Sequence, residues 1–290
     1  MQLFSSDAPA KSYHLQHVLN TTYKEAVLAQ LLEKTANPLY KAHLKSLQNP
    51  GTMLWTSLDL KLPDNLLPNS TFNNSVRMAL ALQPSKAIAT NPHAKCCCGL
   101  LLCDDPLHFY SCPKFRKLAQ NIRHDDVTVV LARCAERAGY VTHREHIFEN
   151  RKRADISLVC PLTGTLTHGD VSVTLASAPS YCLAASRKSL SAAEARVQAK
   201  VTKYAESCRK EGAYFAPIIM ETTGAMSKPA LQLFSRIADL SAATNPHNPE
   251  SATRITQRVA IALHIGNAKI IHQGLSRSSQ AYRPVAGPLP

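Results

Sequence analysis

Arg153-Ala154-Asp155-Ile156-Ser157 and Gly169-Asp170-Val171-Ser172-Val173 each place an aspartate among apolar and β-branched residues. Residues of these types favour β-strands, so each segment is predicted to form a short strand. Between them, Cys160-Pro161-Leu162-Thr163-Gly164 carries the proline and glycine of a turn. The economical interpretation is an antiparallel hairpin that brings the carboxylates of Asp155 and Asp170 together.

A helical stretch follows the predicted hairpin and carries Lys200 and Lys203. Two carboxylates and a lysine are the groups that a magnesium-dependent phosphodiesterase needs. The carboxylate oxygens bind the hard cation, and the ammonium orients water or stabilises negative charge. Either lysine can supply that ammonium, and either can instead be a surface residue of a basic helix.

Apolar periodicity, helix caps and turn residues predict the elements around the hairpin. Helices are expected over residues 12–47, 72–82, 191–212, 227–242 and 250–267, and strands over 140–148 and 214–221. A further helix should begin at Asp125 or Asp126 and end near Gly139. The order helix, three strands, helix, strand predicts an α/β (α+β) core with a mixed sheet flanked by helices.

The amino-acid composition limits the kinds of molecule that the chain is expected to bind. The 290 residues include 33 lysines and arginines against 20 acidic residues, a net charge of +13, and the isoelectric point is about 9.4. This charge favours a polyanionic partner such as nucleic acid or an acidic membrane surface. Among nucleic acids, we expect DNA first and RNA second. No apolar run approaches the roughly 20 residues of a membrane span, and the start of the chain has no secretory signal pattern. We therefore expect a nuclear or cytoplasmic protein that is not secreted and has no membrane partner.

A dense group of metal-ligand residues lies before the predicted core. Five cysteines and one histidine fall within seventeen residues: Cys96, Cys97, Cys98, Cys103, His108 and Cys112. This density is typical of a small tetrahedral zinc site. Cys96 and Cys98 can bind from a turn, and His108 and Cys112 from a short helix, with Cys103 as the alternative to Cys96. The other interpretations are buried cysteines without metal and a catalytic Cys–His pair.

Several short motifs occur in a defined order. They are the Cys/His group, Arg123-His124-Asp125, Arg-x-Asp at 153–155, Asp-Val-x-Val at 170–173, Lys-x-x-x-Tyr at 200–204 and Glu-Thr-x-Gly at 221–224. This order, over roughly residues 72–224, resembles the restriction-like endonuclease region of non-LTR retrotransposon polyproteins. In that family a zinc knuckle and a PD-(D/E)xK-like nuclease follow the reverse transcriptase. The nuclease cuts one strand of target DNA, and the new 3′ end primes reverse transcription.

The resemblance implies roles for individual residues. Asp155 and Asp170 match the two catalytic acids, which would bind Mg²⁺ or Mn²⁺. Lys200, four residues before Tyr204, matches the lysine that this family places on the following helix, so Ser172 at the usual lysine position is no obstacle.

Two glutamates and a set of basic residues extend the predicted site. Glu221 matches a family position of uncertain role, and Glu145 is a candidate extra acid, although both can be solvated strand ends. Phosphate contacts that position DNA without reading its sequence are expected from Arg151, Lys152, Arg153, Arg187, Lys188 and Lys203. The alternative for these basic residues is an ordinary solvated surface.

The predicted organisation is a helical N-terminal region at 1–95, a CCHC-type zinc knuckle at 96–124, a restriction-endonuclease-like core at 125–275 and a disordered tail at 276–290. No reverse-transcriptase core is recognisable before residue 72, so that partner is expected to be missing or supplied by another chain. The leading hypothesis is a metal-dependent DNA endonuclease with a structural zinc ion. The alternatives are an inactive or domesticated nucleic-acid-binding module with the same fold, and a zinc-stabilised interaction protein without a nucleic-acid partner.

Overall fold

A computed structural model of the chain describes residues 23, 25–49, 51–56, 66–115 and 119–281. After a helical stretch at 25–34, the elements are α2 (Pro38–Leu47), η1 (Leu54–Thr56), α3 (Asn69–Ala79), α4 (Lys86–Ala89), η3 (His108–Tyr110), η4 (Pro113–Phe115), α5 (Ala119–Arg137), β1 (Val141–Ile147), β2 (Arg153–Val159), β3 (Leu166–Thr174), α6 (Cys182–Arg187), α7 (Ser191–Lys210), β4 (Tyr214–Glu221), α8 (Lys228–Thr244) and α9 (Ala252–Ala281).

The four strands form one sheet in the order β1-β2-β3-β4. β1 and β2 are antiparallel, as are β2 and β3, whereas β3 and β4 are parallel. Parallel neighbours need a crossover connection, and α6 and α7 lie in the connection between β3 and β4. The mixed sheet and its flanking helices confirm the α/β core expected from the sequence.

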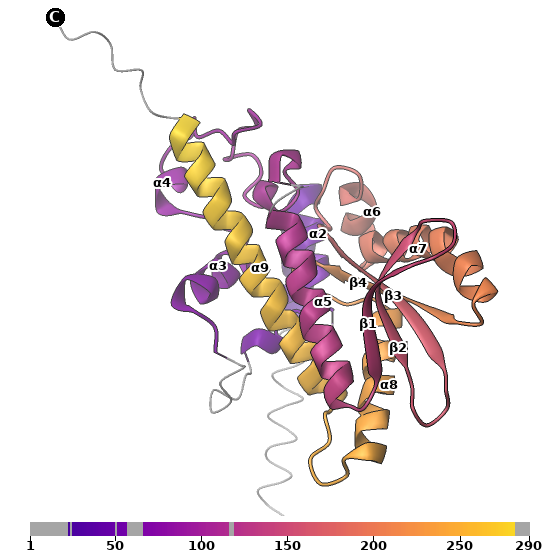
Figure 1. Cartoon of the computed structure of the whole chain (residues 1–290). Coiled ribbons are helices and arrows are strands. Elements are labelled where there is room, and N and C mark those ends of the chain that lie inside the picture. The colour runs from indigo at the N-terminus through magenta and orange to yellow at the C-terminus, as the bar shows by residue number, and fades with distance from the viewer. Residues whose placement is uncertain (1–22, 24, 50, 57–65, 116–118, 282–290) are drawn as a thin grey trace, which may run out of the picture.

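The sheet has helices on both faces (Figure 1). α5, α8 and α9 pack on one face, where Leu131, Phe234 and Val259 meet Ile156 and apolar residues of β3 and β4 in the main core. α7 packs against β3 and β4 on the other face.

The even-numbered residues of β3 face α7, and Asp170 is among them, since it pairs with Lys200 of that helix. Asp155, at the end of the β2–β3 ladder, is contacted by His124 of α5. The predicted acid pair therefore lies at the end of this ladder, with α7 beside Asp170 and α5 beside Asp155.

α9 packs closely against α5 (Figure 1). A buried polar network holds the two helices together. Arg123 on α5 donates from Nη1 to Oδ1 of Asn267 at 2.9 Å, and Nδ2 of Asn267 donates to the carbonyl of Thr222 at 2.9 Å. A Cβ added at Gly266 would lie 2.7 Å from the Cβ of Arg123. Glycine at this position is what allows the two helices to approach so closely.

Three predicted boundaries differ from the structure. α5 begins by Ala119, so Asp125 and Asp126 lie inside the helix rather than at its cap, and the boundary placed at residue 124 falls within one element. α9 continues to Ala281, so residues 276–281 of the predicted tail are helical. The predicted helix at 12–47 is interrupted before Pro38, because Asn37 caps a new helix there by accepting the Leu39 N–H at 2.9 Å. Residues 1–22 and 282–290 of the predicted termini lie outside the described residues.

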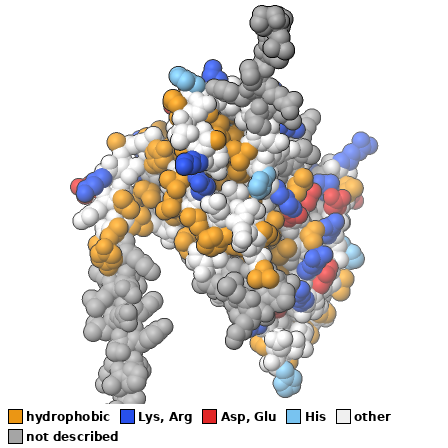
Figure 2. Space-filling model, turned by 90° about the vertical axis from the view of Figure 1, so that its left-hand side faces the viewer, with side chains coloured by type: hydrophobic (Ala, Val, Ile, Leu, Met, Phe, Trp, Pro, Cys, Tyr) orange, Lys and Arg blue, Asp and Glu red, His pale blue; other side chains and the backbone are white. Residues whose placement is uncertain are grey.

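The side of the molecule that carries α3 exposes apolar side chains, and Figure 2 looks onto that side. Phe72, Leu66 and Leu80 are at least half exposed there and line a shallow pocket of about 590 Å³ together with Met53 and Trp55. α7 lies on the other side of the sheet (Figure 1). In the part of the chain that the structure describes, no helix combines the length and apolar character needed to span a membrane.

Candidate functional site

Asp155 and Asp170 are cross-strand neighbours at the point where β2 and β3 stop pairing. The last pair of the antiparallel ladder is Ile156 with Gly169. One position beyond this pair lie Asp155, which precedes Ile156, and Asp170, which follows Gly169. Both side chains are buried. The hairpin and the juxtaposition of its two acids are thus as the sequence predicts.

Asp155 closes the gap at the end of the ladder with its side chain. Its Oδ2 accepts the backbone N–H of Val171 at 2.7 Å, as a strand carbonyl would. The same oxygen lies 2.9 Å from Nε2 of His124, which reaches it from α5, and Nδ1 of His124 lies 3.0 Å from Oδ1 of Asp125. Burial alone would lower the pKa of His124, but Asp155 and then Asp125 raise that pKa to about 9. His124 is therefore a cation beside Asp155 at neutral pH.

Asp170 forms an ion pair with Lys200 of α7. The Lys200 side chain is 14 % exposed and that of Asp170 is 4 % exposed, so the pair is nearly removed from water. Next along the strand face, Ser172 accepts a hydrogen bond from Nε of Arg196 at 3.0 Å. Of the two lysines that the sequence left open, Lys200 is the one at the acid pair, whereas Lys203 donates to the hydroxyl of Tyr204 at 2.7 Å.

Tyr204 lies on α7 one helical turn after Lys200 and connects the helix to the hairpin. Its hydroxyl donates to the carbonyl of Arg153 at 2.7 Å, and its side chain is buried. Burial raises the pKa of Tyr204, and the negative charge of Asp170 raises that pKa further, so the phenol stays protonated as a donor. The tyrosine thereby fixes the distance between α7, which carries Lys200, and the strand that carries Asp155.

The two candidate glutamates have other contacts. Glu145 is exposed, has a left-handed backbone with φ of 60°, and pairs with Arg153 at 3.2 Å. Glu221 is buried and accepts hydrogen bonds from Ser46 of α2 and from the backbone N–H of Ala193 in the first turn of α7. Burial raises the pKa of Glu221, and these two donors oppose that shift. The contacts of Glu221 are those of a residue that caps the start of α7.

The predicted phosphate-binding residues lie around α7 and the β1–β2 turn. Arg151, Arg187 and Lys188 are exposed, and Lys188 forms an ion pair with Glu194. Nζ of Lys152 donates to the Lys203 carbonyl at 2.7 Å. These basic residues thus come from the β1–β2 turn, from α6 and α7, and from the segment between the two helices.

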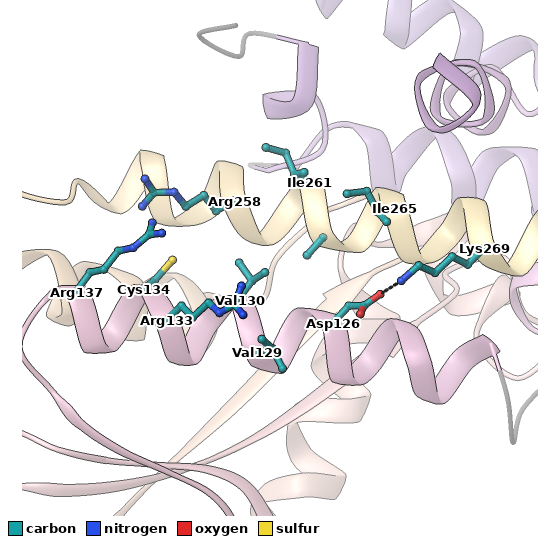
Figure 3. Close-up of a pocket in the computed structure, with 11 residues that line it drawn as sticks. Asp126, Val129, Val130, Arg133, Cys134, Arg137, Arg258, Ile261, Ile265 and Lys269 are labelled. Carbon is teal, nitrogen blue, oxygen red and sulfur yellow. Dashed lines mark hydrogen bonds and ion pairs between the residues drawn. The ribbon is translucent and has the colours of Figure 1, made fainter. Parts of the chain in front are cut away.

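A second basic surface was not anticipated from the sequence. A groove of about 440 Å³ runs between α5 and α9, and Arg133, Arg137 and Arg258 enter it from the two facing helices (Figure 3). Arg258 is paired with Glu250, and Lys269 closes the other end of the groove through a 2.6 Å contact with Asp126. The signal in the sequence was weak, because the arginines come from elements more than 100 residues apart.

The Cys/His group forms a compact cluster. The ligand atoms of Cys96, Cys98, His108 and Cys112 all lie within 4.8 Å of one another. Sγ of Cys96 is 3.6 Å from Sγ of Cys112, and Sγ of Cys98 is 3.1 Å from Nε2 of His108. Cys103 is exposed and its thiol faces the Pro92 carbonyl instead. Three thiols and one imidazole at this spacing fit a tetrahedral zinc ion.

The cluster is part of a second apolar core rather than a free-standing module. Leu107, Phe109 and Phe115 from the same loop pack with Ile270 and Ile271 of α9.

Comparison of the chain with protein-family models and with curated proteins finds no match.

Proposed function

We propose that this chain is a metal-dependent DNA endonuclease that nicks its target, as the retrotransposon nucleases it resembles do. The observation that carries the proposal is the buried Asp155–Asp170 pair with Lys200 of α7 against it. Two carboxylates and one ammonium at the open end of a strand pair are the groups required for metal-assisted phosphodiester hydrolysis.

The acid pair fits a Mg²⁺ or Mn²⁺ ion by the chemistry of its donors. Both contacts of the Asp155 carboxylate use Oδ2, so Oδ1 is its oxygen for a cation, and Asp170 supplies the second carboxylate. Hard oxygen ligands of this kind suit Mg²⁺. When bound, such an ion polarises the scissile phosphate and lowers the pKa of the attacking water.

The other residues of the site have roles that follow from their positions. The Lys200 ammonium would move from Asp170 to the phosphate or to the attacking water, where it stabilises the developing negative charge. His124 would hold the Asp155 carboxylate in one orientation, and Tyr204 would keep α7 in register with the hairpin. Glu221 would act through α7, whose first turn it caps, and Glu145 through Arg153.

DNA would be held by positive charge and by backbone contacts. Arg151, Arg187 and Lys188 are exposed, and the α5–α9 groove offers Arg133 as a further phosphate contact, beside Arg137 and Arg258, which pair with Glu250. Contacts of this kind position DNA without reading its sequence. The zinc ion of the Cys/His cluster would be structural, because the cluster packs into an apolar core.

A second candidate function is binding of nucleic acid without cleavage. It is favoured by one observation, that both acids already face a protein cation, His124 or Lys200. In a module that no longer binds a metal, these cations would compensate the two carboxylates, and the fold and the basic surface would be retained.

The deciding experiment is nicking of supercoiled plasmid by the purified chain with Mg²⁺ or Mn²⁺. Endonuclease function predicts metal-dependent nicking that Asp155→Ala and Asp170→Ala abolish, while Glu206→Gln, an exposed change on α7, retains it. Absence of nicking by the parent chain, with salt-sensitive DNA binding intact, would replace the endonuclease by the binding module.

A further inference from the structure

His146, His168 and Glu211 form a compact group on the α7 side of the sheet. Nε2 of His146 lies 2.9 Å, and Nε2 of His168 3.0 Å, from the same oxygen, Oε2 of Glu211. These three ligand atoms all lie within 4.8 Å of one another. The two imidazole rings stack with their centroids 4.4 Å apart. Three elements, β1, β3 and the end of α7, thus direct metal-binding atoms to one point.

We propose that His146, His168 and Glu211 bind one divalent transition-metal ion, with zinc as the best match, in addition to the ion of the Cys/His cluster. Two imidazoles and one carboxylate form a ligand set that binds zinc with a fourth position open to water. The proposal concerns this site alone and does not depend on DNA cleavage.

The separations of the ligand atoms favour a metal. Bonds of about 2.0–2.1 Å in a tetrahedron place ligand atoms about 3.3 Å apart. The two distances to Oε2 of Glu211 are 2.9 and 3.0 Å, so movements of a few tenths of an ångström would admit an ion.

A fourth residue orients one of the ligands. Nδ1 of His168 lies 2.7 Å from the hydroxyl of Ser157, and the His168 ring is buried. Metal-bound histidines commonly use their second nitrogen in such a hydrogen bond, which fixes the ring and its tautomer. Phe148 contacts both rings edge-on, and its ring centroid lies 4.9 Å from that of His146 and 5.0 Å from that of His168.

The site is accessible from solvent. A pocket of about 400 Å³ is lined by Phe148, Asn150, Ser207 and Glu211 among others. The Glu211 and His146 side chains are each about 30 % exposed, at 29 % and 33 %. An ion and its water ligand can therefore enter beside the carboxylate without opening the core.

The first test is the zinc content of the purified full-length chain after dialysis against a slight excess of zinc. The proposal predicts two zinc ions per chain in the wild type and one in His146→Gln and in Glu211→Gln. Asp239→Asn, which changes an exposed carboxylate on α8 outside this pocket, is the matched control and should retain two. Cobalt substitution assigns the ions, because only the thiolate cluster gives sulfur-to-cobalt charge-transfer bands.

A second test uses the wild-type chain and needs no variant to fold. Without metal, the Glu211 carboxylate can only accept, so Nε2 of a neutral His168 carries the proton and Nδ1 accepts from Ser157. With metal on Nε2, the proton would reside on Nδ1 and be donated to Ser157. Zinc should therefore switch the His168 tautomer in ¹⁵N-edited NMR spectra. A wild-type chain that binds a single zinc ion, unaffected by His146→Gln, or a tautomer that zinc leaves unchanged, would overturn the proposal.

Discussion

Replacing Lys200 with methionine tests whether the Asp170–Lys200 pair is as isolated from water as the structure indicates. Methionine retains much of the length and apolar volume of lysine but removes the ammonium. The change leaves the Asp170 carboxylate, whose side chain is 4 % exposed, without its cationic partner. We expect Lys200→Met to lower the free energy of unfolding substantially in the absence of metal.

The size of the effect follows from burial. Removing one partner of a buried ion pair typically costs about 3–5 kcal/mol, because the other charge is left uncompensated. The Lys200 side chain retains 14 % exposure, so the lower end of that range applies, about 3 kcal/mol.

The assay is urea unfolding followed by circular dichroism for the wild type, Lys200→Met, Asp170→Asn and the double variant. The double variant should recover about 2 kcal/mol relative to the sum of the single changes, because neither charge is left alone. Lys210→Met is the matched control on α7: its partner Glu206 and its own side chain are both well exposed, so the change should stay within about 0.5 kcal/mol.

Magnesium links this experiment to the proposed function. If a divalent cation binds at Asp170, Mg²⁺ should stabilise Lys200→Met more than the wild type, because the ammonium no longer competes. A concentration ten times the dissociation constant contributes about 1.4 kcal/mol. A coupling energy near zero in the double-variant cycle would refute the buried pair, and equal stabilisation of both proteins by Mg²⁺ would refute a cation site at Asp170.

Three further outcomes are expected. The pKa of His124 is raised to about 9, so the ion pair of His124 with Asp155 stabilises the fold fully below pH 6.5, and this stabilisation is lost as the pH rises through 9. In urea unfolding without metal, the wild type should be about 2–3 kcal/mol more stable than His124→Gln below pH 6.5, and this difference should disappear above pH 9. Cys98→Ser should lose the zinc ion proposed for the Cys/His cluster and lower the melting temperature by about 5 °C or more. Cys103→Ser should keep the zinc content in metal analysis and the melting temperature in calorimetry. Gly266→Ala should destabilise by about 1–3 kcal/mol through overpacking of α5 against α9, and an unchanged urea midpoint would contradict the close helix contact.

The features that the sequence predicted well are local in the chain. The Asp155–Asp170 hairpin depends on two β-branched segments and the Pro/Gly turn between them, all within about twenty residues. The Cys/His cluster is equally compact, and its spacing predicted the four residues that lie together, with Cys103 left as the alternative to Cys96. Lys200 and Tyr204 are one helical turn apart, so a single helix face brings both to the sheet.

The features that the sequence did not predict join distant segments. His124 reaches Asp155 because α5 begins well before the acidic residues that resemble a cap, and the packing of α9 on α5 then sets its position. His146, His168 and Glu211 come from three elements and have no common motif. No local pattern specifies such contacts, since each depends on how whole elements pack.

The packing of α9 connects the Cys/His cluster to the acid pair. The loop that supplies His108 and Cys112 rests through Phe109 on α9, and a Cβ added at Gly274 would lie 2.8 Å from the ring of Phe109. The same helix contacts α5, the element that orients His124 toward the acid pair. Removal of the zinc ion proposed for the Cys/His cluster should therefore affect residues outside the loop that carries the cluster. We expect chelation to shift the NMR resonances of His124 as well as those of the loop. Changes confined to the loop would instead mean that the knuckle and the α/β core behave as two independent units.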